Sequence, residues 1–138
     1  MNNEIKDLIS KYEVKGDFNY ANVTDEMLCS AEKELGVNLP DQFKEYVKTF
    51  GYGGIGGIGI LGVGLDGSIV FKDTTQDYRK EGLPDNLVVI ENVDEWLECI
   101  DCHTGKIISW DTSGYLKEDF DCFDDYLLSQ MNDAIENL

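Results

Sequence analysis

The sequence predicts an α+β fold with N-terminal helices, a central antiparallel sheet of about five or six strands, and a C-terminal helix packed on the sheet. Apolar residues recur with helical spacing over the first 50 residues, short apolar segments separated by turn signals follow, and helical spacing returns near the C-terminus. Helices and strands that occur in separate runs are typical of this class. A chain of 138 residues with 42% hydrophobic residues can bury one core, so we predict a single domain over residues 1–138.

Three helices are expected before any strand. The first covers residues 3–13, where apolar side chains recur three and four positions apart. Thr24 caps the second helix, and Gly36 suits its C-terminal end. Pro40 begins the third helix at the position that needs no backbone N–H donor. The residues expected to be buried on these helices are Ile5, Leu8, Ile9, Tyr12, Met27, Leu28, Ala31, Leu35, Phe43, Tyr46, Val47 and Phe50.

The central part of the chain has the pattern of strands. Glycine-rich residues 51–57 lead into an apolar segment at 58–63, and Asp66-Gly67 indicates a hairpin turn before another strand at 68–71. Further strands are predicted at 87–90, 95–101 and 106–110. The closing helix is predicted from the spacing of Phe120, Phe123, Leu127, Met131, Ala134 and Leu138.

Glycine motifs in the sequence do not predict a nucleotide site. The pattern G-x-G-x-x-G begins at Gly51, Gly54 and Gly62. A dinucleotide site requires a strand before this turn and a helix after it, so that the pyrophosphate meets the helix N-terminus. Here the first match follows a helix, and the third leads into a predicted strand. Tight turns and close backbone packing explain these glycines better.

Two further motifs resemble cofactor or metal sites. Cys99 to His103 spells C-x-x-C-H, the attachment signature of c-type haem, but such haem is attached in exported proteins. The cysteine spacing matches no standard zinc site. The acidic segment 118–125 lacks the glycine turn of a calcium loop. His103, the only histidine, is expected to be a solvated turn residue, which leaves no base for a nucleophile. We therefore expect no catalytic, cofactor-binding or metal-binding residues and no enzymatic activity.

Charge separates the possible partners. The chain has 28 acidic and 11 basic residues, and the segment 91–138 alone has 13 acidic and 2 basic residues. Nucleic acids and acidic membranes are disfavoured as ligands, because both attract Lys and Arg. A surface of one sign speeds the approach of a cationic protein. The alternative is that the acidity only keeps the protein soluble. The charge pattern says nothing about oligomeric state.

The cysteines and the N-terminus predict a compartment. The first residues contain no basic patch followed by an apolar run, so no secretory signal is expected. No segment approaches the ~20 apolar residues of a membrane span. The four cysteines, in a chain with ordinary core content, are typical of reduced thiols. The expected location is the cytoplasm.

A predicted hairpin suggests an interaction surface. If residues 102–105 form its loop, one face is apolar and meets the core; it consists of Leu97, Cys99, Ile108 and Trp110. The opposite face consists of Trp96, Glu98, Ile100, Ile107, Ser109 and Asp111. A tryptophan beside carboxylates is a plausible binding anchor. Two alternatives stay open: a helix buries Trp96 as ordinary core, or a one-residue slip exchanges the two faces.

The order of these features resembles the SMI1/KNR4, or SUKH, superfamily. The resemblance covers residues 23–130 and is greatest to the bacterial YobK-like branch across residues 87–101. The resemblance rests on the ordered set of segments and on no single motif. The matching segments are Ala31 to Pro40, the helix to Phe50 with Gly51 and the following glycines, Gly82-Leu83-Pro84, Leu87 to Ile90, Ile100-Asp101, Trp110-Asp111 and the closing aromatic helix.

The resemblance implies an α+β domain without enzymatic activity. Bacterial relatives commonly act as cytoplasmic immunity proteins that neutralise a toxin domain, often a nuclease, and eukaryotic relatives are regulatory binding proteins in cell-wall signalling. A nuclease binds phosphates through a basic cleft, which an acidic inhibitor can cover. We therefore expect a basic toxin as partner, with a regulatory interaction scaffold as the alternative and a small enzyme or metal-binding protein as a weaker one. The predicted partner-binding residues are Trp96, Glu98, Asp101, Asp111, Tyr115, Glu118 and Asp121.

Overall fold

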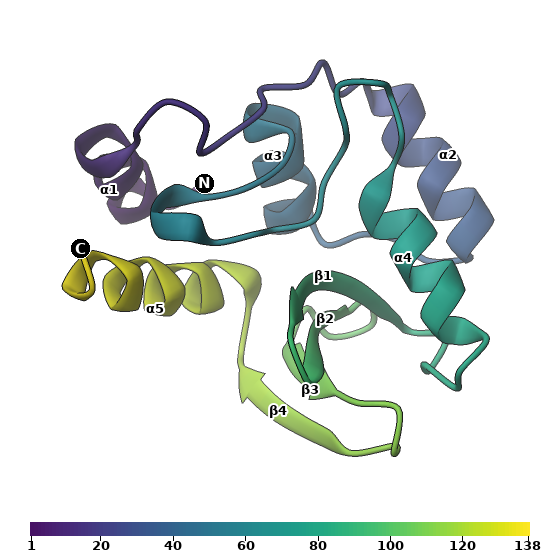
Figure 1. Cartoon of the computed structure of the whole chain (residues 1–138). Coiled ribbons are helices and arrows are strands. Elements are labelled where there is room, and N and C mark those ends of the chain that lie inside the picture. The colour runs from purple at the N-terminus through teal and green to yellow at the C-terminus, as the bar shows by residue number, and fades with distance from the viewer.

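Five α-helices and one four-stranded antiparallel sheet make up the fold, and the strands lie side by side in their order along the chain (Figure 1). The computed structural model describes residues 1–138. The helices are α1 (Asn3–Tyr12), α2 (Asp25–Leu35), α3 (Asp41–Phe50), α4 (Val70–Arg79) and α5 (Phe123–Glu136), with a short 3-10 helix, η1 (Ile55–Gly57). The strands are β1 (Leu87–Val93), β2 (Trp96–Asp101), β3 (Ile107–Trp110) and β4 (Leu116–Phe120). The α+β class is confirmed, but the prediction of five or six strands is wrong.

The first three helices are confirmed, although α1 ends one residue earlier and α3 begins one residue later than predicted. The Thr24 side chain accepts a hydrogen bond from the backbone N–H of Met27, 3.2 Å away, at the start of α2. Gly36 ends α2 in the left-handed conformation, with φ of 70°, which glycine adopts without steric cost. Pro40 is the residue before α3, which starts at Asp41. Burial of one face stabilises each short helix more than its own backbone hydrogen bonds do.

The predicted strand at 68–71 is wrong, because α4 begins at Val70. Only a single antiparallel bridge, between Val63 and Ile69, remains of the expected hairpin. Phe71 and Thr75 are fully buried one helical turn apart, and Thr75 hydrogen-bonds to β1. The β-branched residues before and within this segment favour a strand locally, but burial at helical spacing selects the helix.

The apolar segment 58–63 is buried without joining the sheet. The N–H of Leu61 donates to the carbonyl of Ile90 at 2.8 Å, and that of Val63 donates to the carbonyl of Gly51 at 3.0 Å. A Cβ atom on Gly62 would lie 1.7 Å from the same Gly51 oxygen. The glycine-rich stretch therefore allows close contact between backbone segments. The third G-x-G-x-x-G pattern, Gly62 to Gly67, is followed by helix α4 and not by the expected strand.

The fourth strand was not predicted. Residues 116–120 form β4 at the edge of the sheet, and most of this strand is exposed and charged. Such a strand lacks the alternation of apolar and polar residues that indicates strands in a sequence, and its charges protect an edge from pairing with another chain. Phe120 belongs to β4 and only mimics the spacing of α5, which starts at Phe123.

The hairpin of β2 and β3 has the predicted register. Leu97 pairs with Trp110, Cys99 pairs with Ile108, and the N–H of Asp101 donates to the Lys106 carbonyl at 2.8 Å. The alternative of a one-residue slip is therefore wrong. On the face predicted to meet the core, Leu97, Cys99 and Trp110 are buried, as expected, whereas Ile108 is half-buried.

Helices cover both faces of the sheet, but the cover is incomplete. On the face of Trp110, α4 brings the ring of Tyr78 to 6.2 Å between ring centroids. On the opposite face, α5 brings the ring of Tyr126 to 5.4 Å from that of Phe120. The middle of the sheet is therefore buried on both sides, whereas Trp96, at the start of β2, is 43% exposed.

Candidate protein-binding surface

Four of the seven predicted partner-binding residues line one depression at the open end of the sheet. These residues are Trp96 and Glu98 on β2, and Asp111 and Tyr115 on either side of the turn from β3 to β4. The depression, which we call the Trp96 depression, has a volume of about 360 Å³. Its other lining residues are Glu95, Ser109, Lys117 and Asp119.

Trp96 presents its ring to solvent while its ring nitrogen is bonded. The indole Nε1–H donates to Glu98 Oε1 at 2.9 Å. The alternative interpretation of Trp96 as core is wrong, because Trp96 is 43% exposed. The buried tryptophan of the hairpin is Trp110, which is only 2% exposed. A tryptophan held by a hydrogen bond loses little freedom on binding, which suits an interaction anchor.

Glu98 is a buried acid with an incomplete set of partners. Its side chain lies next to Ser109, whose hydroxyl is 2.6 Å from Glu98 Oε1, and the residue is only 5% exposed. The other carboxyl oxygen, Oε2, is buried without a hydrogen-bond partner. Burial, together with the charge of Asp119, raises the pKa of Glu98 to about 7, although the hydrogen bonds from Ser109 and Trp96 lower it.

Ser109 joins two carboxyl groups. Its hydroxyl oxygen contacts both Glu98 and Asp119, although a serine hydroxyl has a single proton to donate. Both contacts are hydrogen bonds only when one carboxyl is protonated. Lys117 is the nearby cation, with its Nζ 3.8 Å from Asp119 Oδ1. The floor of the Trp96 depression is therefore rich in carboxylates, with one partly exposed lysine to balance them.

The turn between β3 and β4 forms one wall of the depression. Asp111 accepts hydrogen bonds from the backbone N–H of Ser113, at 2.9 Å, and from its hydroxyl. These hydrogen bonds, the one from the hydroxyl above all, lower the pKa of Asp111, so this carboxylate is charged near neutral pH. Tyr115, 55% exposed, stands beside it.

Glu118 and Asp121 lie next to the Trp96 depression and not in it. Together with Asp125 they line a second, acidic hollow of about 270 Å³, which shares Asp119 with the first. Glu118 pairs with Lys106, with 3.3 Å between the charged atoms. The acidic face of the protein, which we define as these two adjoining hollows, extends from the sheet to the start of α5.

Asp101 does not belong to the acidic face. It ends β2 at the opposite end of the hairpin, where its carboxylate accepts a hydrogen bond from the backbone N–H of His103 at 2.8 Å. The side chain is buried and stabilises the tight turn. The structure assigns it a role in the hairpin and does not bring it to the other predicted residues.

Asp119 and Lys117 were missed as site residues. Both lie on β4, which the sequence pattern did not predict, so their place beside Glu98 was not foreseeable from hydrophobic spacing. The available signal was the pairing register: once β4 is placed, Lys117 lies opposite Ser109, which lies opposite Glu98. Paired residues share one face of a sheet.

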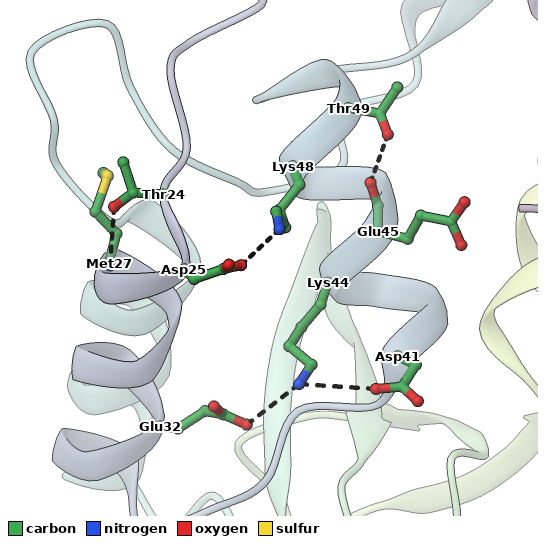
Figure 2. A network of polar contacts seen from close by, with 9 residues as sticks. All are labelled: Thr24, Asp25, Met27, Glu32, Asp41, Lys44, Glu45, Lys48 and Thr49. Atoms are coloured by element: carbon green, nitrogen blue, oxygen red, sulfur yellow. Dashed lines mark hydrogen bonds and ion pairs between the residues drawn. The ribbon is translucent and has the colours of Figure 1, made fainter.

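A second groove, between α2 and α3, has a different electrostatic character. It has a volume of about 610 Å³ and is lined by charged residues of both signs. Figure 2 shows that Lys48 contacts Asp25, at 2.5 Å, and that Lys44 reaches both Glu32, at 3.9 Å, and Asp41, at 3.7 Å. The acids in this groove are largely neutralised within the protein, whereas those of the acidic face are not.

The cysteine motif is not arranged as a cofactor site. Cys99 is fully buried and burial raises the pKa of its thiol, whereas His103 is exposed in the turn. Burial also raises the pKa of Cys102 to about 12. No group of three or more His, Cys, Asp or Glu side chains has an arrangement that could hold a metal ion. None of the helices combines the length and the apolar character that a membrane crossing requires.

The comparisons with known proteins define the class and then the family. The fold is similar to that in the crystal structure of a protein from Pseudomonas syringae pv. tomato, with a TM-score of 0.64 and 16% identity over 94% of this chain and 96% of that one. The family described as SMI1-KNR4 cell-wall (SUKH_5) matches residues 1–132. The protein is thus a small α+β domain of a class with immunity or protein-interaction roles. The chain belongs to the SMI1-KNR4 (SUKH) family, which confirms the resemblance inferred from the sequence.

Proposed function

We propose that this chain is a non-enzymatic immunity protein that binds and neutralises a toxin domain with a basic, nuclease-type surface. The observation that supports this most strongly is the exposed Trp96, hydrogen-bonded to Glu98 in a depression lined by several carboxylates. Family membership supports an immunity or protein-interaction role in general. The charge of the acidic face supports the choice of a basic partner.

The charge distribution explains why binding would be fast. The segment 91–138, with 13 acidic and 2 basic residues, includes all the residues that line the acidic face. Carboxylates around a small aromatic centre steer a cationic protein toward it, and the centre then slows dissociation. An inhibitor of an enzymatic toxin needs rapid association, because each free toxin molecule acts repeatedly.

The proposal is tested by co-expressing the chain with the product of the gene adjacent to its own, which we expect to carry the toxin domain, and scoring growth. Wild-type protein should restore growth, and the double variant Glu118→Lys/Asp121→Lys should restore it less, because the reversed charges repel a basic toxin. The variant Asp7→Asn, which changes an exposed acid on α1, is the control and should restore growth fully. No rescue by the wild-type protein would contradict an immunity role.

The family description also names cell-wall proteins, which favours a regulatory scaffold as the second candidate. The same surface would then bind a cellular protein and no toxin. Two results together would support this second function. The wild-type protein would capture one basic cellular protein that the Trp96→Ala variant does not capture, and it would not restore growth in the co-expression test.

A further inference from the structure

Glu98, which lines the Trp96 depression, has one carboxyl oxygen that is buried and lacks a partner. Glu98 lines the depression between Trp96 and Ser109, and these two residues bond to the same oxygen, Oε1. Oε2 is buried and accepts no hydrogen bond from the protein. A buried carboxyl oxygen without a donor destabilises the fold, because the water it has lost is not replaced. A ligand that supplies the missing hydrogen-bond donor would explain why such a group is present.

The surroundings of Glu98 define what this ligand would be. A second carboxyl, Asp119, lies on the other side of Ser109, and the two aromatic rings of Trp96 and Tyr115 are exposed at the rim. Carboxylates below and aromatic rings beside a hollow suit a flat cation that both donates hydrogen bonds and stacks.

We propose that the Trp96 depression binds a single arginine side chain of the partner protein, with the guanidinium group between the carboxyls of Glu98 and Asp119 and against the ring of Trp96. This inference rests on the proposed function, because it assumes that the acidic face binds a basic protein. The terminal torsion of a glutamate is broad, so the Glu98 carboxyl can turn its free oxygen toward the ligand. The deepest part of the interface would then be an arginine in an aromatic and acidic pocket, as in many binding hot spots.

Arginine suits the depression better than lysine. The guanidinium group has five donors in a rigid plane, which can serve two carboxyls on either side of Ser109 at once. It is also more weakly hydrated than an ammonium group and stacks on aromatic rings. Lys117 Nζ, 3.8 Å from Asp119, would move toward solvent when the guanidinium group arrives.

The test uses N-acetyl-L-arginine methylamide as the probe and the indole N–H signal of Trp96 in an NMR titration of the full chain. The Trp96→Phe variant identifies that signal, because the protein has two tryptophans. At constant ionic strength we expect a saturable shift of the signal, with binding about two- to fivefold tighter than that of N-acetyl-L-lysine methylamide. A shift that is linear in concentration and equal for both compounds would overturn the inference.

Variants separate the pocket from general attraction to an acidic protein. Glu98→Gln should raise the dissociation constant of the arginine probe about tenfold, because the charge-assisted hydrogen bond is lost. Asp119→Asn, at a half-buried site on β4, gives the same test with little risk to the fold. Glu136→Gln, at an exposed residue of α5 without an ion pair, is the matched control and should leave the affinity unchanged. Equal affinities in all three variants would contradict the inference.

The inference and the proposed function can fail separately. If the arginine probe does not bind but Trp96→Ala still weakens binding to the toxin domain, the arginine pocket is rejected and the proposed binding surface is retained. If the probe binds with the expected selectivity but no toxin domain is neutralised, the pocket stands and the immunity function is wrong.

Discussion

The indole nitrogen of Trp96 donates a hydrogen bond to Glu98, two residues further along the same strand and 2.9 Å away. The two side chains lie on one face of β2, as strand geometry requires for positions two apart. This pair fixes an exposed aromatic ring against a buried acid. It joins the aromatic and the acidic parts of the surface into one feature.

Replacement of Trp96 by alanine tests the aromatic part. We expect Trp96→Ala to weaken binding to the partner by about 2 kcal/mol, or roughly 30-fold in Kd, because a central aromatic anchor is lost. The melting temperature should change little, since the ring is 43% exposed. Isothermal titration calorimetry and thermal unfolding check both statements. Leu65→Ala, at an apolar residue that is 79% exposed and outside the acidic face, should leave the Kd unchanged.

The raised pKa of Glu98 predicts a dependence of stability on pH. Its pKa is about 7 in the folded protein and near 4.5 when unperturbed, so the folded state holds this proton more tightly. The contribution of Glu98 to stability therefore falls as pH rises from about 4.5 to about 7 and stays low above that. The neighbouring charged or titratable groups are Glu91 on β1, Asp119 and Lys117 on β4, and Tyr126 on α5.

The variant Glu98→Gln removes this dependence. Relative to the wild type, we expect it to gain about 1–3 kcal/mol of unfolding free energy on going from about pH 4 to about pH 8. Urea unfolding at the two pH values measures the change. Glu136→Gln, which is exposed, should follow the wild type at both. A constant difference between Glu98→Gln and the wild type would show that Glu98 does not titrate in this range.

Thr75 links α4 to the sheet. Its hydroxyl donates to the carbonyl of Phe71 at 2.7 Å and accepts from the N–H of Val89 at 2.9 Å, and the residue is fully buried. Thr75→Val keeps the shape but leaves the Val89 N–H without a partner, which should destabilise the protein by about 1–3 kcal/mol. Chemical unfolding measures the loss. Thr74→Val, at a half-buried neighbour, should cost less, and equal losses would mean that the hydrogen bond to β1 contributes little.

Gly62 allows two backbone segments to meet. A Cβ atom there would lie 1.7 Å from the carbonyl oxygen of Gly51, which also accepts the N–H of Val63. Gly62→Ala should therefore destabilise the fold by about 3 kcal/mol or more, because backbone has to move. Gly59→Ala is the matched control, since a methyl group at Gly59 would have no other atom within 4 Å. Similar melting temperatures for the two variants would contradict this contact.

Much of the hairpin and the first three helices could be predicted from the sequence, because each has a local signal. Thr24 and Gly36 mark the ends of α2, and the turn after Asp101 sets the register that places Glu98 opposite Ser109. In these segments the propensity of the residues, their apolar spacing and the turn residues all favour one structure.

The remaining elements depend on contacts distant in sequence. Val70 begins a helix although its neighbours favour a strand, because burial of Phe71 and Thr75 against β1 decides the outcome. The strand β4 is held mainly by pairing with β3 and lacks the apolar alternation that indicates a strand in a sequence, so Asp119 could not be placed beside Glu98. The aromatic and acidic character of the site could be predicted from the sequence, but the contribution of Lys117 and Asp119 from β4 could not.

The decisive measurement is the rate at which the chain associates with the product of the gene adjacent to its own, followed by stopped-flow fluorescence at several salt concentrations. If the acidic face steers a basic partner, the rate should fall about tenfold or more between ~20 mM and ~500 mM salt, because salt screens exposed charges. The double variant Glu118→Lys/Asp121→Lys should start from a lower rate and depend less on salt. A rate that is the same at all salt concentrations, for both proteins, would contradict electrostatic steering by the acidic face.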